Sequence, residues 1–191
     1  MIKINRPNCP NPLALQTNYK DPVNKKALLN ASFGKCMYCE SKIGHVYFGD
    51  VEHIKPKSVY SDLTFDWLNL GYVCAKCNNS KKDKFYEETP YINPYDENPD
   101  DFLISLGSMY SPRKGSERGE ITILDIELNR PELIEKRLNR LGDIEKALNA
   151  CMRTANEALK DNALKAIIRE AETDKEYSYF VKTYLELQGV V

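Results

Sequence analysis

Two pairs of cysteines, Cys36 with Cys39 and Cys74 with Cys77, constrain this chain more than any other feature. Each pair encloses two residues, and 34 residues separate one pair from the other. A tight turn over such a gap points both thiolates at one ion, and four thiolates complete a tetrahedral zinc site. A full shell of four cysteines leaves no position for water or substrate, so we expect a structural zinc ion that contributes to folding. The alternative is four unrelated buried cysteines.

The composition indicates a globular protein of the cytoplasm. Of 191 residues, 42% are hydrophobic and 29% are charged, which fits one domain or a small domain with an appendage. The first residues lack the apolar stretch of a signal peptide, and no apolar run is long enough to span a membrane. A reducing compartment leaves thiols free to bind metal, and Cys9 and Cys151 are interpreted as free thiols.

Charge is distributed unevenly along the chain. Residues 1–90 contain 13 Lys and Arg against 9 Asp and Glu, whereas residues 91–191 contain 14 against 19. A modestly basic first half suits a polyanionic partner such as nucleic acid.

The first half divides into a proline-rich N-terminal arm, residues 1–22, and a core, residues 23–90. Proline and asparagine favour extended and turn conformations in the arm. Apolar spacing and turn residues in the core predict a helix over 23–33, strands over 43–48, 51–54 and 70–74, and a helix over 76–88 that ends before Pro90.

The second half divides into a loop-rich connector, residues 91–130, and a helical C-terminal region, residues 131–191. The connector contains one candidate strand, 102–106. Pro131 suits the first position of a helix, Asp161 or Asn162 can cap the next one, and a last amphipathic helix covers 177–185. One helical face is expected to be apolar and contains Ile134, Leu138, Leu141, Leu148, Met152, Ala155 and Leu159.

The residues with catalytic potential lie between and just after the cysteine pairs. Glu52 and His53 end a predicted strand before Pro56, and Asn78 begins the helix after Cys77. Hydrolysis of a phosphodiester needs a base near neutral pH, a Lewis acid and cationic donors. His53 can be the base, Glu52 and Asn78 offer oxygens to Mg²⁺ or Mn²⁺, and positive charge comes from Lys55, Lys57, Lys81 and Lys82.

These motifs, in this order, resemble the HNH or ββα-metal (His-Me finger) nucleases. The matching residues are Cys36-x-x-Cys39, Glu52-His53-Ile54-x-Pro56, Trp67-x-Asn69-Leu70 and Cys74-x-x-Cys77-Asn78-x-x-Lys81. The resemblance implies an α+β fold, a zinc-stapled ββα-metal nuclease core with a C-terminal α-helical appendage. It also implies that His53 is the general base and that Asn69 braces the loop. The chain departs from the family's usual pattern at Glu52, where Asp is commoner, and at Asn78, where the family more often has its final histidine.

Each assignment has a simpler alternative. His53 and His45 can be structural histidines, and we interpret His45 that way. Asn78 can be a helix N-cap, with Asn79 as the substitute ligand. The lysines from Lys76 to Lys84 can be a solvated helix face, with Lys81 at the spacing of a phosphate contact. Trp67 is interpreted as a core residue.

A narrower resemblance connects the chain to the PtuB-like HNH effectors of Septu and some retron anti-phage defence systems. It rests on Gly119 to Ile123 followed by Leu128-Asn129-Arg130-Pro131. The resemblance implies an ATPase partner of the PtuA type. The expected substrate is nucleic acid; DNA is favoured over RNA, although no short motif in the sequence distinguishes the two. The rival interpretation is a non-catalytic, zinc-stapled nucleic-acid-binding adaptor. In a third interpretation the protein acts chiefly as a docking subunit of a larger complex, through the helices of residues 131–188.

Overall fold

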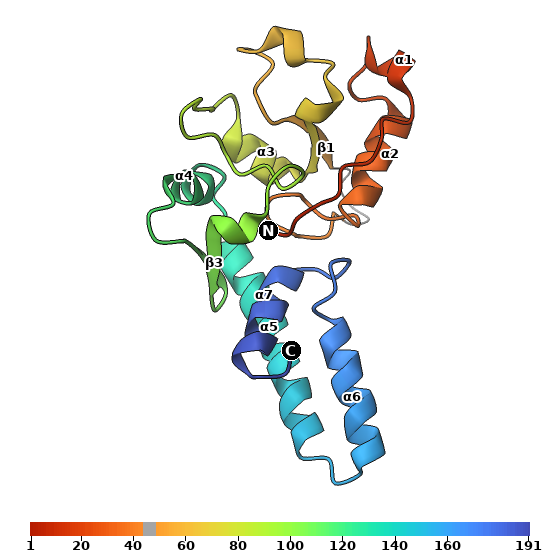
Figure 1. Ribbon diagram of the computed structural model, residues 1–191, viewed down its shortest axis with the longest axis vertical. Helices are drawn as coiled ribbons and strands as arrows, with labels where there is room; N and C mark the ends of the chain where they lie inside the picture. The colour runs from red at the N-terminus through yellow and green to blue at the C-terminus, as the bar shows by residue number, and fades with distance from the viewer. Residues whose placement is uncertain (44–48) are drawn as a thin grey trace.

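The computed structural model describes residues 1–43 and 49–191, and its shape is elongated, with a wider and a narrower part (Figure 1). The wider part contains two small sheets and the short helices, and the narrower part is a helical arm. This mixture of helices and small sheets confirms the predicted α+β class. The helices of the wider part are α1 (Pro12–Leu15), α2 (Pro22–Ala31), α3 (Ala75–Lys81) and α4 (Glu117–Asp125), with 3-10 turns at Ser61–Leu63, Trp67–Asn69 and Pro99–Asp101.

The centre of the wider part is a ββα unit. Strand β1 (Asp50–His53) pairs antiparallel with β2 (Leu70–Val73), so that Glu52 lies opposite Gly71. Helix α3 follows β2 after one residue, Cys74, whose side chain caps the helix by accepting a hydrogen bond from Cys77 N. The strands predicted over 51–54 and 70–74 and the helix predicted over 23–33 are therefore confirmed, whereas the strand predicted over 43–48 falls mostly outside the described residues.

Helix α3 is shorter than predicted. It ends at Lys81, because Lys82 has φ 51° and ψ −133°, a conformation that cannot continue a helix. Beyond it, the Phe85 ring packs with its centroid 5.5 Å from that of Tyr60 and 6.5 Å from that of Tyr91. Packing of this aromatic residue replaces the helical turns that the sequence predicted up to residue 88.

The connector has more regular structure than predicted. The candidate strand is β3 (Leu103–Leu106), and it pairs antiparallel with an unpredicted strand, β4 (Met109–Pro112). Helix α4 was also missed, although Ser116 caps it by accepting a hydrogen bond from Gly119 N. Thr122 of α4 is buried and its hydroxyl accepts a hydrogen bond from Ile92 N, which fixes the helix on the segment that follows the ββα unit.

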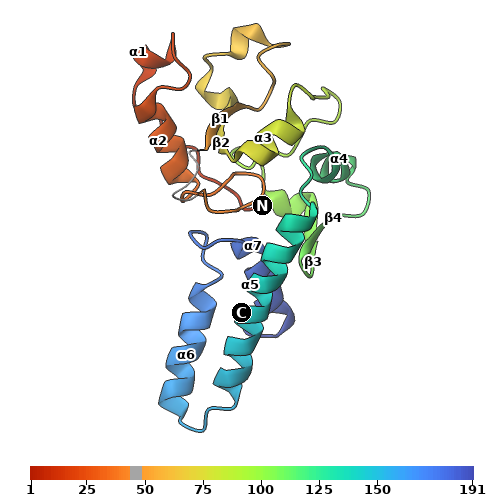
Figure 2. The ribbon, with the colours of Figure 1, turned by 180° about the vertical axis from the view of Figure 1, so that it is seen from behind.

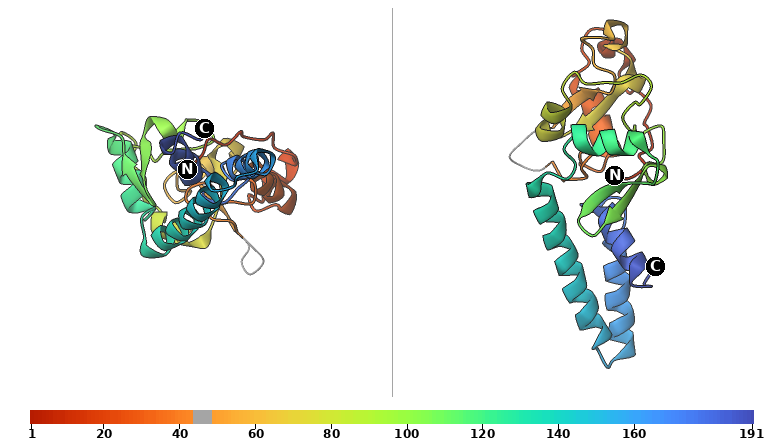
Figure 3. Two further views of the ribbon diagram at one scale, coloured as in Figure 1. Left: turned by 90° about the horizontal axis from the view of Figure 1, so that it is seen from below. Right: turned by 90° about the vertical axis from the view of Figure 1, so that its left-hand side faces the viewer.

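The helical arm consists of α5 (Pro131–Met152), α6 (Glu157–Arg169) and α7 (Ser178–Leu187). Helices α5 and α6 form an antiparallel hairpin that extends away from the sheets, and α7 lies beside the first half of α5 (Figures 2 and 3). The predicted cap of α6 was wrong: Asn156 caps it, and Asp161 and Asn162 lie inside the helix. Among the described residues, no helix combines the length and the apolar composition needed to cross a membrane.

The apolar face predicted for the arm was partly wrong. Leu138, Met152 and Leu159 are exposed, although Leu141 and Leu148 are buried as predicted. The buried face of α5 is rotated by about one residue from the predicted face. It includes Arg137, a charged residue that a prediction based on apolar residues alone does not place in the interior. The buried residues of α5 are Leu133, Arg137, Leu141, Ile144, Leu148 and Cys151.

The N-terminal arm packs into the core between the two parts. Met1 and Ile4 are buried, and Ile4 N donates to Pro94 O at 2.8 Å. Arg6 Nη1 donates to Trp67 O and Leu70 O, at the entry to β2. The arm thus lies along the ββα unit and helps to fix the loop before β2.

Candidate nuclease site and zinc centre

The two cysteine pairs meet in one cluster. The four sulfur atoms of Cys36, Cys39, Cys74 and Cys77 lie within 4.8 Å of one another, and Cys39 Sγ is 3.8 Å from Cys74 Sγ. A zinc tetrahedron with Zn–S bonds of about 2.3 Å has S–S edges of roughly 3.8 Å. The cluster therefore fits the predicted structural zinc ion. Within residues 1–43 and 49–191 it is the one place where three or more Cys, His, Asp or Glu side chains bring their ligand atoms this close together.

Local backbone geometry builds the cluster. The first pair forms a turn in which Glu40 N donates to Cys36 O and Glu40 has φ 63°. Met37 N donates to Tyr72 O, which fixes this turn on β2. A side chain at Gly71 would collide with Met37 Sδ, so glycine there lets the Met37 side chain pack directly against the strand.

His53 ends β1 and is 7% exposed. Its Nε2 lies 3.0 Å from Thr64 O. A carbonyl oxygen only accepts hydrogen bonds, so Nε2 must carry the proton and Nδ1 keeps its lone pair. Burial lowers the pKa of His53 below its usual value, and the positive charges of Lys57, Lys81 and Lys20 lower it further. The hydrogen bond that the imidazole donates to Thr64 O opposes this shift. The environment thus favours a neutral imidazole that is able to accept a proton.

Glu52 precedes His53 and forms a buried ion pair with Lys81. Glu52 Oε1 lies 2.6 Å from Lys81 Nζ, and the lysine side chain is fully buried. Lys81 Nζ also donates to His53 O at 3.0 Å. Burial raises the pKa of Glu52 above its usual value, and Lys81 opposes this shift. The predicted phosphate contact of Lys81 is not favoured by this position, because the ammonium group faces the protein interior.

Asp50 and Asn78 lie side by side at the site. Asn78 Nδ2 is 3.4 Å from Asp50 Oδ2, so the amide oxygen of Asn78 remains available to an ion. Both residues line a pocket of about 340 Å³ together with Glu52 and His53. Carboxylate and amide oxygens suit Mg²⁺ or Mn²⁺, so this donor set fits a divalent ion. Asn79, the alternative ligand, also lines the pocket. The helix α3 is capped by Cys74, so Asn78 is not its N-cap.

Asn69 organises the loop between the strands. Its side chain accepts a hydrogen bond from Lys55 N and donates to Lys55 O and Leu63 O. This network fixes the segment after His53 against the segment that contains Thr64. The position agrees with the bracing role implied by the family resemblance, and it does not bring Asn69 into the pocket lining.

The other predicted phosphate-binding lysines occupy two places. Lys57 and Lys82 are exposed and line the pocket, together with Lys20. Lys55 lies outside it, with Nζ 5.3 Å from the ring centre of Tyr60 and 5.6 Å from that of Phe85. The pocket therefore combines oxygen ligands on one strand and one helix with lysines around them.

Prediction from the sequence missed several residues of this pocket, among them Asp50 and Tyr19. Asp50 could have been found, because it lies two residues before Glu52 and alternate residues of a strand share a face. Tyr19 had no such signal, since it belongs to the N-terminal arm. Trp67 is partly buried, and its indole N–H donates to Pro7 O at 2.8 Å, which agrees with a structural role. The predicted structural role of His45 concerns a residue outside the described part of the chain.

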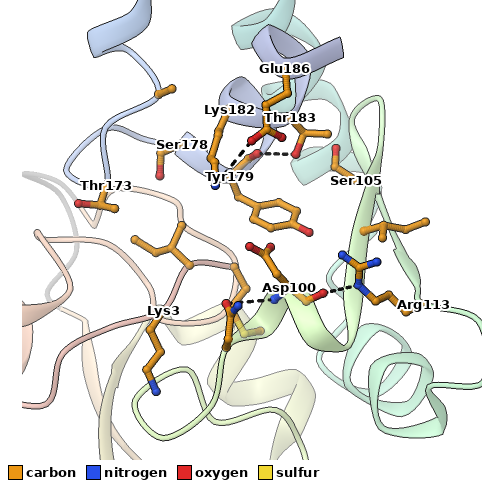
Figure 4. A pocket seen from close by; sticks show the side chains of 15 residues that line it. Lys3, Asp100, Ser105, Arg113, Thr173, Ser178, Tyr179, Lys182, Thr183 and Glu186 are labelled. Carbon is orange, nitrogen blue, oxygen red and sulfur yellow. Dashed lines mark hydrogen bonds and ion pairs between the residues drawn. The ribbon is translucent and has the colours of Figure 1, made fainter. Parts of the chain in front are cut away.

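A second cavity, about 380 Å³, lies where the N-terminus, β3 and α7 meet (Figure 4). Arg113 Nε donates to Asp100 O there, and Lys182 lies 3.7 Å from Glu186. Its charged residues are of both signs, and no predicted site residue lines it.

Comparison with known proteins bears on the family of the chain. Residues 36–84 match the family model of the HNH endonucleases. The chain is 30% identical over 158 residues to Septu protein PtuB of Bacillus mycoides strain KBAB4, a match that covers 66% of this chain and 54% of that protein. It is 27% identical over 214 aligned positions to Septu protein PtuB of Bacillus thuringiensis, covering 97% of this chain and 82% of that protein. The chain thus spans about half of the first relative, and both predicted resemblances are confirmed.

Proposed function

We propose that this chain is a metal-dependent HNH endonuclease that hydrolyses phosphodiester bonds in nucleic acid. The observation that carries this proposal is the hydrogen bond between His53 Nε2 and Thr64 O in a pocket that also contains Asp50, Glu52 and Asn78. This arrangement sets the tautomer of a histidine beside a set of oxygen ligands. The match of residues 36–84 to the HNH endonuclease model supports the same function.

The residues of the pocket divide the chemistry among them. His53 Nδ1 takes the proton from the attacking water, while Thr64 O holds the imidazole in the required tautomer. Asp50, Glu52 and Asn78 would hold a divalent ion, and such an ion would supply Lewis-acid stabilisation of the charge on the phosphate and the leaving oxygen. Glu52 would contribute to this ligand set only if its carboxylate gave up part of its pairing with Lys81.

Lysines at the pocket bind the substrate backbone. Lys57 and Lys82 line the pocket and are exposed, so their ammonium groups are able to reach a phosphate. We expect DNA to be cleaved in preference to RNA. Cleavage should leave 5′-phosphate and 3′-hydroxyl ends, as the family resemblance implies. Zinc on the four cysteines has a structural role, because four thiolates leave no position for water.

The similarity to Septu protein PtuB of two Bacillus species suggests a biological context. We propose that the nuclease acts in anti-phage defence, in the cytoplasm, together with an ATPase partner of the PtuA type. The partner would direct or restrain cleavage.

Cleavage of plasmid DNA and of total RNA, with Mg²⁺ or Mn²⁺ and with or without the ATPase, tests the proposal. His53→Ala is expected to abolish cleavage while zinc content, melting temperature and nucleic-acid affinity stay nearly unchanged, because a general base acts in the transition state. His45→Ala is the matched control, since His45 is the other of the chain's two histidines. Cleavage that survives in His53→Ala would contradict the mechanism. Tight binding without cleavage by the wild type would favour a non-catalytic adaptor.

A further inference from the structure

Tyr19 contacts two residues of the proposed nuclease site at once. Its ring lies against the imidazole of His53, with centroids 4.5 Å apart and an interplanar angle of 63°. Its hydroxyl accepts a hydrogen bond from Lys57 Nζ at 2.9 Å, and the same ammonium group lies 4.6 Å from the ring centre. One side chain therefore links the proposed base to a proposed phosphate-binding cation.

The segment around Tyr19 is fixed to the protein. Asn24 is fully buried, and its side chain exchanges two hydrogen bonds of 2.9 Å with the backbone of Asn11, which closes residues 11–24 into a loop. Asn18 Oδ1 accepts a hydrogen bond from Lys20 N, and Asp21 caps α2 immediately afterwards. These bonds on both sides of Tyr19 give its ring a defined position in the pocket wall.

We propose that Tyr19 is a positioning residue of the nuclease site: it holds the His53 imidazole in one orientation and directs Lys57 toward the substrate phosphate. The proposal rests on the proposed function and deepens it. Tyr19 lies outside the part of the chain that matches the HNH endonuclease model, residues 36–84, yet it lines the same pocket as His53. The N-terminal arm thereby contributes to a site that the ββα unit alone leaves open on one side.

The ring and the hydroxyl have separable effects. The Thr64 hydrogen bond holds one edge of the His53 imidazole, and the Tyr19 ring restrains its tilt. A misplacement of about 1 Å in a catalytic group can cost roughly a hundredfold in rate. Loss of the hydroxyl removes one contact to an exposed lysine, and such a contact contributes little on its own.

Steady-state cleavage of a fluorescent DNA duplex with Mn²⁺ separates these effects. Tyr19→Ala is expected to lower kcat by roughly ten- to a hundredfold. Tyr19→Phe keeps the ring, so kcat should stay within about twofold of the wild type while KM rises by up to about fivefold. Tyr184→Ala, which removes a partly buried tyrosine ring from α7, is the matched control and should leave both constants unchanged. The proposal would be overturned if Tyr19→Ala kept the wild-type kcat and KM while its zinc content and melting temperature were intact. It would also be overturned if kcat in Tyr19→Phe fell as low as in Tyr19→Ala.

A second measurement does not depend on turnover. In ¹⁵N-labelled protein the imidazole nitrogens of the two histidines can be observed by NMR and assigned with His53→Ala. The wild type is expected to show His53 as one tautomer, protonated at Nε2, because its ring stays in place to donate to Thr64 O. In Tyr19→Ala the ring is free to tilt and keeps this hydrogen bond only part of the time, so a mixture of tautomers is expected. If the wild type cleaves no substrate but this change occurs, the proposed function fails and the positioning role stands. An unchanged tautomer in Tyr19→Ala overturns the positioning role even if the wild type is an active nuclease.

Discussion

Lys81 and Glu52 form an ion pair of 2.6 Å inside the ββα unit, and it connects the helix to the strand that carries His53. Lys81 lies at the family's spacing from Cys77, where the sequence suggested a phosphate contact. The pairing indicates a different reason for lysine at this position: it compensates a carboxylate that the fold buries next to the proposed base.

Breaking this pair should be strongly destabilising. Lys81→Met leaves the Glu52 carboxylate buried without its partner, and we expect a loss of about 3 to 5 kcal/mol in the free energy of unfolding. Replacing both residues, as Lys81→Met with Glu52→Leu, should recover much of that loss, because no uncompensated charge remains. Denaturant unfolding in a zinc-buffered solution measures both. Lys82→Met, on the exposed neighbour, is the control, and an equal effect of Lys81→Met and Lys82→Met would contradict the prediction.

The zinc centre should be required for folding. Cys77→Ser removes one ligand from a site whose binding energy is on the order of 10 kcal/mol, so we expect a protease-sensitive or aggregated protein. Cys9→Ser is the matched control, because Cys9 lies outside the cluster. Its thiol donates a hydrogen bond to Asn24 Oδ1, which a serine hydroxyl can also donate. Metal analysis and limited proteolysis provide the readouts. A Cys77→Ser protein that lacks zinc and still melts cooperatively would contradict this role.

Arg130 should strengthen zinc binding from outside the ligand set. Its Nη1 lies 3.5 Å from Cys77 Sγ, where a guanidinium offsets the negative charge of four thiolates around one Zn²⁺. We expect Arg130→Met to lower zinc affinity by roughly ten- to a hundredfold in competition with a chelator. Arg153→Met removes an exposed arginine at the other end of α5 and should have no effect. Equal zinc affinities for the two variants would argue against the prediction.

Asp50 and Asn78 should act through the catalytic ion. Asp50→Asn and Asn78→Ala are each expected to lower cleavage in Mg²⁺, because each removes or weakens an oxygen ligand. Excess Mn²⁺ should restore part of the activity, since Mn²⁺ binds such ligands more tightly than Mg²⁺. Asp83→Asn is the control, because Asp83 lines the same pocket but lies beyond the end of α3. Activity that depends equally on Asp83 and Asp50 would rule out the assigned ligand set.

The parts of the site with fixed spacing could be predicted from the sequence. Cys36, Cys39, Cys74 and Cys77 were identified because two short turns bring all four sulfurs to one point. His53 and Asn78 follow from the same motif order, and the structure places both at one pocket. Their catalytic roles stay predictions until cleavage is measured.

The remaining features depend on tertiary contacts that have no local pattern. Lys81 looks like part of a solvated helix face until Glu52 is seen to pair with it. The contact between Tyr19 and His53 joins residues 34 positions apart, through a loop that Asn24 closes. The short strand β4 was missed because its pairing with β3, and not its own periodicity, defines it.

Glu40 links the helical arm α5–α7 to the part of the molecule that contains the sheets. Its buried carboxylate lies 2.7 Å from the Met1 amine and 3.4 Å from Lys35 Nζ, and it accepts hydrogen bonds from the Ser178 hydroxyl and Tyr179 N at the start of α7. Separating the helical arm from the sheets would remove the hydrogen bonds that Ser178 and Tyr179 donate to the buried Glu40 carboxylate. Leaving a buried charge without partners is costly in a protein interior. Heating should therefore melt both parts in one cooperative transition, with equal calorimetric and van't Hoff enthalpies. Visual boundaries between parts of a ribbon need not be thermodynamic ones.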